Sequence, residues 1–203
     1  MQDQNVVEIC EFLIHPAIES QDQELTLLAI ECIGLIAILD KVVFQNYALI
    51  FKSILDNKEP NHQKERIVAL KAAVDGLIVH GIFDDSTRLI FNDITQVHLF
   101  ERDPPLKQIA VEGVCKMMFS LKLCEQIPNE DMEAILVSLL VQLFDRKYNA
   151  LNSLVRSLLS VFLKNFVLLS NQRCQLLLGA VTKLVCAVFS AKYGKQVKAQ
   201  KKK

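Results

Sequence analysis

The stretch ALKAAVDGLIVHG (Ala69–Gly81) decides the fold, because its apolar residues follow the spacing of an α-helix and its pattern occurs three times in the chain. The three copies are LTLLAIECIGLIAILDK (Leu25–Lys41), ERIVALKAAVDGLIVHG (Glu65–Gly81) and LKQIAVEGVCKMMFSLK (Leu106–Lys122). Aligning Thr26, Arg66 and Lys107 gives offsets of 40 and 41 residues. A repeat of this length predicts a row of similar helical units.

Small residues occupy two matching columns of the three copies, Ala29/Ala69/Ala110 and Cys32/Ala72/Gly113. Small side chains let neighbouring helices approach closely, so both columns are predicted helix contacts. Other amphipathic segments lie between the copies, at Phe44–Leu55, Ser86–Phe100 and Asn129–Phe144, and a weaker fourth copy is VRSLLSVFLKNF (Val155–Phe166). The pattern therefore predicts an all-α fold, an α-solenoid of stacked antiparallel helix pairs.

Composition agrees with one helical domain. The 203 residues are 51% apolar, and only five prolines interrupt the apolar pattern. Lysines and arginines balance aspartates and glutamates at 23 each, but from Lys192 onward there are six lysines and no acid. We therefore expect a single solenoid over residues 2–191, with four to five helix pairs, and a basic, disordered tail over 192–203.

The cysteines and the apolar runs indicate a cellular setting. Six cysteines lie inside apolar helical patterns and form no Cys-x-x-Cys pair, which predicts buried free thiols in a reducing compartment. No secretory signal is visible. Uncharged apolar runs such as Ala134–Phe144 are shorter than the roughly 20 residues that a bilayer requires. These features predict a soluble intracellular protein with no membrane partner.

Three ordered pieces carry a resemblance to a known family. A pair length near 40, with Arg or Lys before Ala and a small residue, resembles the HEAT repeat. AIECIGLIAILDK (Ala29–Lys41), DGLIVHG (Asp75–Gly81) and VRSLLSVF (Val155–Phe162), in this order, resemble the C-terminal region of the condensin complex subunit 3 family, the HEAT subunit called G. The resemblance covers roughly Ala29–Ala191.

The resemblance implies a function. Such a subunit binds DNA and the kleisin subunit within condensin and helps SMC ATPases to compact mitotic chromosomes, without catalysis of its own. It implies a location in the nucleus, on chromosomes, with the cytoplasm as an alternative outside mitosis. The family's full subunit is several times longer than this chain.

The sequence itself offers no catalytic, cofactor or metal site. It contains no phosphate loop, nucleophile elbow or paired-carboxylate constellation. His62 and His80 would lie about 27 Å apart on one helix, too far to share an ion. Lys41, Gly81 and Lys122 fall twelve residues after the aligned alanines, so each is predicted to end its helix, which makes His80 a helix-end residue.

Cations on the repeated helices are the candidate nucleic-acid contacts. DNA-backbone binding needs spread positive charge, and Lys64, Lys71, Lys116 and Lys164 are the candidates, with a solvated helix face as the alternative. Arg66, Lys107 and Arg156 share a register and are predicted to hold neighbouring repeats together. Met117, Met118 and Phe119 form one candidate kleisin patch, although core packing is favoured for at least two of them.

A second function remains open, that of a general HEAT or armadillo adaptor which binds peptides, as in a transport or phosphatase scaffold. Salt separates the two, since affinity for DNA phosphates falls steeply as the salt concentration rises.

Overall fold

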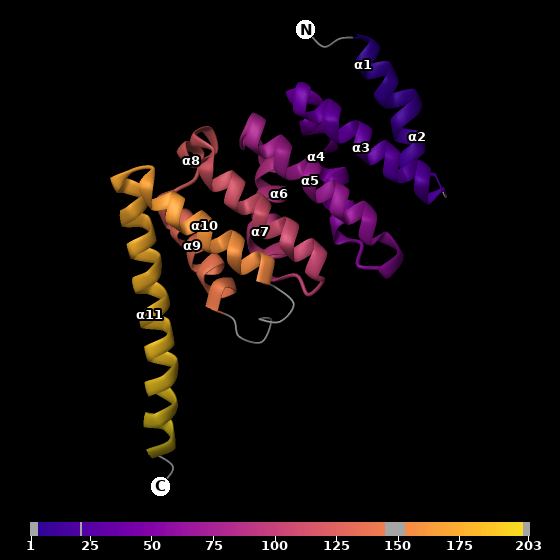
Figure 1. Ribbon diagram of the computed structural model, residues 1–203. Coiled ribbons are helices and arrows are strands. Elements are labelled where there is room, and N and C mark those ends of the chain that lie inside the picture. Colours follow the sequence, from indigo (N-terminus) through magenta and orange to yellow (C-terminus); the bar gives the residue numbers. More distant parts are fainter. Residues whose placement is uncertain (1–3, 21, 145–152, 201–203) are drawn as a thin grey trace. The chain divides into compact units, whose positions relative to one another are not determined.

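The computed structural model describes residues 4–20, 22–144 and 153–200, and it describes side chains over 6–20, 22–144 and 153–191. The described residues form helices joined by short turns, with no strand among them. They divide into two compact units, residues 1–126 and 127–203. The all-α prediction is confirmed (Figure 1).

The first unit begins with a helical segment of mixed type, α1 (Gln4–Ile9), a π-helical turn (Cys10–Ile14) and α2 (His15–Ile18). Then come α3 (Gln23–Leu39), α4 (Lys41–Asp56), α5 (Gln63–His80), α6 (Asp85–Gln96), α7 (Pro104–Phe119) and α8 (Leu121–Gln126). Two 3-10 turns, Pro60–His62 and His98–Phe100, precede α5 and α7. The three copies of the sequence pattern are therefore α3, α5 and α7.

Aspartates begin most of these helices. Asp22 accepts hydrogen bonds from the backbone of Glu24 and Leu25, and Asp40 does the same at the start of α4. Asp84 forms a capping box with Thr87, and Asp103 caps α7. Each carboxylate satisfies backbone N–H groups that have no partner within the helix, which fixes where the helix begins.

The repeated helices stack directly on one another. Helix α5 packs against α3 on one side and α7 on the other, while α4 packs against α3, α5 and α6 (Figure 1). A Cβ atom added at Gly34 would lie 2.8 Å from the Cβ of Ala72, and one added at Gly113 would lie 2.6 Å from the side chain of Val74. The predicted close contacts are confirmed at Ala72 and Gly113. Cys32 is exposed, and Gly34 makes the approach in α3 instead.

Helix ends correct one prediction. Gly81 ends α5 with φ of 78°, the left-handed region that glycine adopts at little cost, as predicted. Lys41 and Lys122 do not end helices. Helices α3 and α7 end before Asp40 and Ser120. Lys41 is therefore the first residue of α4, and Lys122 lies in α8.

The second unit contains α9 (Asn129–Phe144), α10 (Ser153–Leu168) and α11 (Asn171–Gln200), each packed on the other two. Helix α10 holds the weak fourth copy. Helix α11 extends to Gln200, past the predicted boundary at residue 191, and the side chains of 192–203 lie outside the described residues. The single solenoid over 2–191 and the tail over 192–203 stay predictions.

The thiols differ from the predicted buried set. Cys10 and Cys115 are buried, and burial raises the pKa of the Cys115 thiol to about 12, so this thiol stays protonated. Cys124 is half-buried, whereas Cys32, Cys174 and Cys186 are exposed. All six are unbridged, but burial was wrong for three of them because the helices that carry those three leave that face uncovered.

Candidate functional site

The exposed face of α3 and α5 carries a groove between the two helices. Close contact of Gly34 with Ala72 brings the backbones together, and Leu35, Ile38 and Val68 provide apolar walls. The polar lining consists of Glu31, Lys71 and Asp75. A shallow apolar groove with a mixed-charge edge is suited to a peptide.

Two of the candidate lysines lie among acids. Lys116 Nζ is 2.7 Å from Glu112 Oε1, and this hydrogen bond raises the pKa of Lys116. The pKa of Asp75 is raised, mainly by burial, while Lys116 and Lys71 act in the opposite direction and Glu112 adds to the increase. Glu112 and Asp75 therefore lie near Lys116, and Asp75 also lies near Lys71. A phosphate bound by these lysines would be repelled by the neighbouring carboxylates.

The other two candidate lysines have different surroundings. Lys64 is exposed in the first turns of α5, and Lys164 is exposed on α10 in the second unit. Neither makes an ion pair within the described residues. Their charges are therefore available to an outside anion.

The aligned cations have unequal roles. Arg66 is buried, and its guanidinium donates to Glu101 Oε2 at 2.7 Å and to the carbonyl of Leu55 at 3.1 Å. This confirms that Arg66 joins neighbouring repeats. Lys107 is also buried, whereas Arg156 is exposed on α10.

A buried histidine that the sequence did not indicate, His98, lies beside the Arg66–Glu101 pair. His98 Nε2 is 3.1 Å from Asp93 Oδ2, and its Nδ1 is 3.9 Å from Glu101 Oε2. Burial lowers the pKa of His98 and outweighs the opposing effect of Asp93. Hydrogen bonds from Arg66 and from the backbone of Arg102 outweigh burial and lower the pKa of Glu101.

His80 has a structural role. Its Nε2 donates to the carbonyl of Ala37 at 2.8 Å, in the last turn of α3, and its ring stacks on Phe44. One repeat later Lys122 Nζ donates to the carbonyl of Val79 at 3.0 Å, in the last turn of α5. Each link spans 43 residues, so a side chain from the next repeat satisfies a helix-end carbonyl. The prediction that His80 belongs to a helix end is confirmed.

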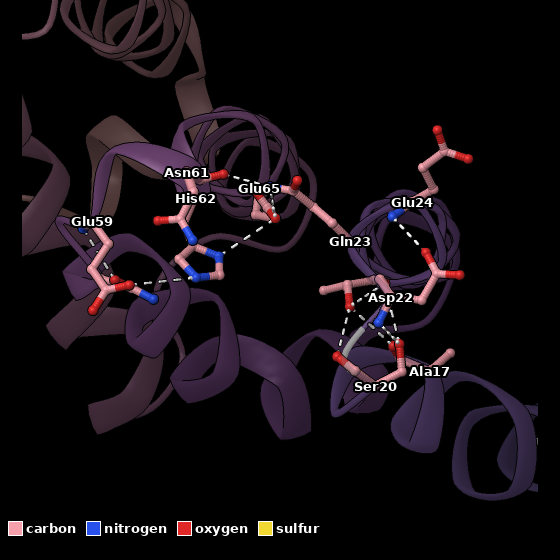
Figure 2. A network of polar contacts seen from close by, with 11 residues as sticks. Ala17, Ser20, Asp22, Gln23, Glu24, Glu59, Asn61, His62 and Glu65 are labelled. Atoms are coloured by element: carbon pink, nitrogen blue, oxygen red, sulfur yellow. Dashed lines mark hydrogen bonds and ion pairs between the residues drawn. The ribbon is translucent and has the colours of Figure 1, made fainter.

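Glutamines form a similar ladder at the opposite ends of these helices. Gln63, the first residue of α5, donates to Asp103 at the start of α7. Gln23, the first residue of α3, donates to Glu65 Oε1 at 2.9 Å and to the carbonyl of Asn61 (Figure 2). The ladder therefore joins the beginning of each repeated helix to the next.

A polar pocket of about 540 Å³ borders the first step of this ladder. The imidazole of His62 lies beside Glu65, with Nδ1 3.5 Å from Oε1 (Figure 2). Glu65 is only 2% exposed, and its Oε2 has no hydrogen-bond partner in the described part of the chain. The sequence did not indicate this site, because a single glutamate on a helix is common.

Residues Met117–Phe119 do not form an exposed patch. Met117 and Met118 are both 1% exposed, and Phe119 is partly exposed. Core packing, favoured for at least two of the three, is confirmed.

The prediction that every apolar run is too short to span a bilayer is wrong for α11. Residues Asn171–Ala191 are long and apolar enough to cross a bilayer by length and composition, because Arg173 and Lys183 are too few to interrupt the segment. One such helix is weak evidence for a membrane. Lys183 pairs with Glu133 of α9, and Arg173 is buried against the ring of Phe166.

Comparison with known proteins adds one finding. The family model of nuclear condensing complex subunits, C-terminal domain, matches residues 1–202. No curated protein matches the chain. Since the match spans nearly the whole sequence, the chain belongs to the family of nuclear condensin complex subunits, in their C-terminal domain.

Proposed function

We propose that the chain is a non-catalytic scaffold of condensin that binds the kleisin subunit and DNA, beside the SMC ATPases, in mitotic chromosome condensation. The family match over residues 1–202 carries this proposal, and membership of a nuclear complex supports a nuclear, chromosomal location. Stacked helix pairs provide the extended faces that repeat proteins use to bind partners.

The groove between α3 and α5 is the proposed kleisin site. Its walls are apolar, and Leu35 is exposed on its edge. An apolar peptide side chain seated there would cover surface that otherwise faces water. We expect Leu35→Asp to reduce recovery of the kleisin and SMC ATPases with the tagged chain. Leu168→Asp, at an exposed leucine of α10, is the matched control, and equal losses from both would contradict the site.

DNA binding is assigned first to Lys64 and Lys164, and second to Lys71 and Lys116, which have acid neighbours. Each phosphate contact adds about 0.9 to the slope of log affinity against log salt. We therefore expect Lys64→Gln with Lys164→Gln to reduce that slope by roughly 2, and Lys71→Gln with Lys116→Gln to change it less. Fluorescence anisotropy with duplex DNA measures this. Equal slopes in all variants would remove these lysines from the interface.

The mixed charge of the same groove favours the second candidate, a peptide-binding adaptor. Glu31 and Asp75 lie with Lys71 along its edge, which suits a polypeptide better than a polyanion. DNA affinity without steep salt dependence, together with recovery of peptides unrelated to condensin, would support the adaptor.

A further inference from the structure

The pocket beside Glu65 has the composition of a binding site for a long basic side chain. Its walls come from the end of α2, the start of α3, the end of α4 and the turn before α5. Ile18 and Ile54, both half-buried, give it an apolar side. Asn57, Asn61 and Glu65 are among its polar lining residues. An alkyl stem would contact the first group and a cationic head the second.

Glu65 is the unusual member of this pocket. Buried carboxylates are costly unless both oxygens are paired, yet only Oε1 has partners, the amide of Gln23 and the ring of His62. The Gln23 amide is neutral and the imidazole is 3.5 Å away, so neither contact supplies a close, permanent positive charge.

The aligned repeats show that packing does not require an acid here. One position before the Thr26, Arg66 and Lys107 column, the other two copies have leucine, Leu25 and Leu106, and Leu106 is fully buried. A leucine therefore serves the same register position in α7. Glu65 therefore places a buried carboxylate where the aligned copies have an apolar residue, in a repeat that has an adjoining polar pocket.

We propose that this pocket binds an arginine side chain of a partner polypeptide, with the guanidinium directed to Glu65 and the stem packed along Ile18 and Ile54. A guanidinium is favoured over an ammonium because it carries several donors in one plane and is weakly hydrated. Here the acceptors are dispersed among amide and carboxylate oxygens. The inference does not rest on the proposed condensin role, so its failure would leave that role untouched.

The test uses the full chain and the peptide acetyl-Ala-Arg-Ala-amide, with the same peptide carrying citrulline as a neutral isostere. Side-chain amide signals of Gln23, Asn57 and Asn61 in NMR spectra report the binding. We expect the arginine peptide to shift these signals and the citrulline peptide to bind at least roughly tenfold more weakly, since hydrogen bonds to charged groups contribute more than neutral ones.

Two variants separate binding from folding. Glu65→Gln removes the charge and keeps the shape, and Glu65→Leu installs the residue of the aligned copies, so both should fold and lose binding by roughly tenfold or more. Glu112→Gln removes one acid charge from α7 and should bind as the unmodified chain does. The proposal is overturned if the citrulline peptide binds equally, if Glu65→Gln retains affinity, if the same peptide with lysine in place of arginine binds as tightly, or if the shifted signals belong to other residues.

Discussion

Helix α5 and helix α11 are both apolar, yet their surroundings are opposite. Helix α5 has α3 and α7 on its two sides and α4 across it, so Leu70 and Leu77 are fully buried. Helix α11 contacts α9 and α10, and leaves Leu178 and Val188 more than half exposed. In a repeat protein each helix pair is buried by its neighbours. Position in the stack, more than helix composition, therefore decides which side chains are buried.

Both helices also have a buried arginine near their N-terminus, and the two arginines differ in their partners. Arg66 of α5 has a carboxylate and a carbonyl, whereas Nη1 of Arg173 in α11 has no hydrogen-bond partner among the described residues. The ring of Phe166, 5.2 Å from the guanidinium carbon of Arg173, provides a cation–π contact instead. The charge of Arg66 therefore joins neighbouring repeats, whereas the charge of Arg173 makes no ion pair among the described residues.

Arg66→Met should give the largest effect of this comparison. It removes the donor to half-buried Glu101 Oε2 and to the buried carbonyl of Leu55, while Glu101 keeps the backbone N–H of Arg102, and we expect a loss of about 3–5 kcal/mol in the free energy of unfolding. Arg173→Met keeps the packed stem and removes a poorly paired charge, so the change should stay within about 1 kcal/mol. Urea unfolding measures both, and equal losses would contradict the distinction.

Leucines test the same contrast without charge. Leu70 is 0% exposed in α5, and Leu178 is 66% exposed in α11. Leu70→Ala leaves a cavity and should cost about 3 kcal/mol. Leu178→Ala should change stability by less than about 0.5 kcal/mol. A large loss at Leu178 would show that another element covers α11 in solution.

Helix existence was predictable because it depends on local spacing. The period of three and four residues placed α3, α5, α7 and α10. Matching small residues found Ala72 and Gly113. The prediction of a close helix contact at Cys32 was wrong, because the contact point depends on the direction in which two helices cross. In α3 that point is Gly34, which lies against Ala72.

The polar contacts were mostly beyond reach of the sequence. Glu101 contacts both Arg66 and His98 at the end of a 3-10 turn, and no helical pattern encodes the side-chain directions of such a turn. The exposure of apolar residues such as Leu178 and Val188 on α11 was also not predicted. An apolar helix face can pack against another element, but the sequence pattern does not show whether such an element is present. The lysine set was identified from charge alone, although Lys71 with Asp75 and Glu112 with Lys116 have the i, i+4 spacing of neighbours on a helix face and were readable from the sequence.

A smaller effect should appear as a pH dependence in the first unit, since all four histidines precede residue 127. Burial, with a contribution from Arg66, lowers the pKa of His98 below its usual 6.5, although Asp93 and Glu101 oppose the shift. The unfolded chain therefore binds a proton first. The contribution of His98 to stability is fully present above its unfolded pKa of 6.5 and is lost as the pH decreases below it toward the pKa of the folded state.

His98→Gln should flatten that dependence, and His15→Gln, at an exposed histidine of α2, should leave it unchanged. Unfolding free energies measured from pH 7.5 down to about 5 test the sign. A wild-type chain that becomes more stable on acidification across this range would contradict a buried neutral His98.

The smallest expected effect concerns single links between helices. His80→Phe keeps a ring to stack on Phe44 but leaves the carbonyl of Ala37 without its donor, so we expect a loss of about 1 kcal/mol. Lys183→Met removes the pair with Glu133 from the surface of α11, where a solvated ion pair contributes about 0–0.5 kcal/mol. Urea unfolding of both variants in low and high salt separates them. The His80 loss should persist in salt, because a part-buried hydrogen bond to a backbone carbonyl is screened less than a surface ion pair, whereas any Lys183 loss should vanish. A salt-sensitive loss at His80 would mean that the end of α3 is held by charge rather than by the carbonyl link.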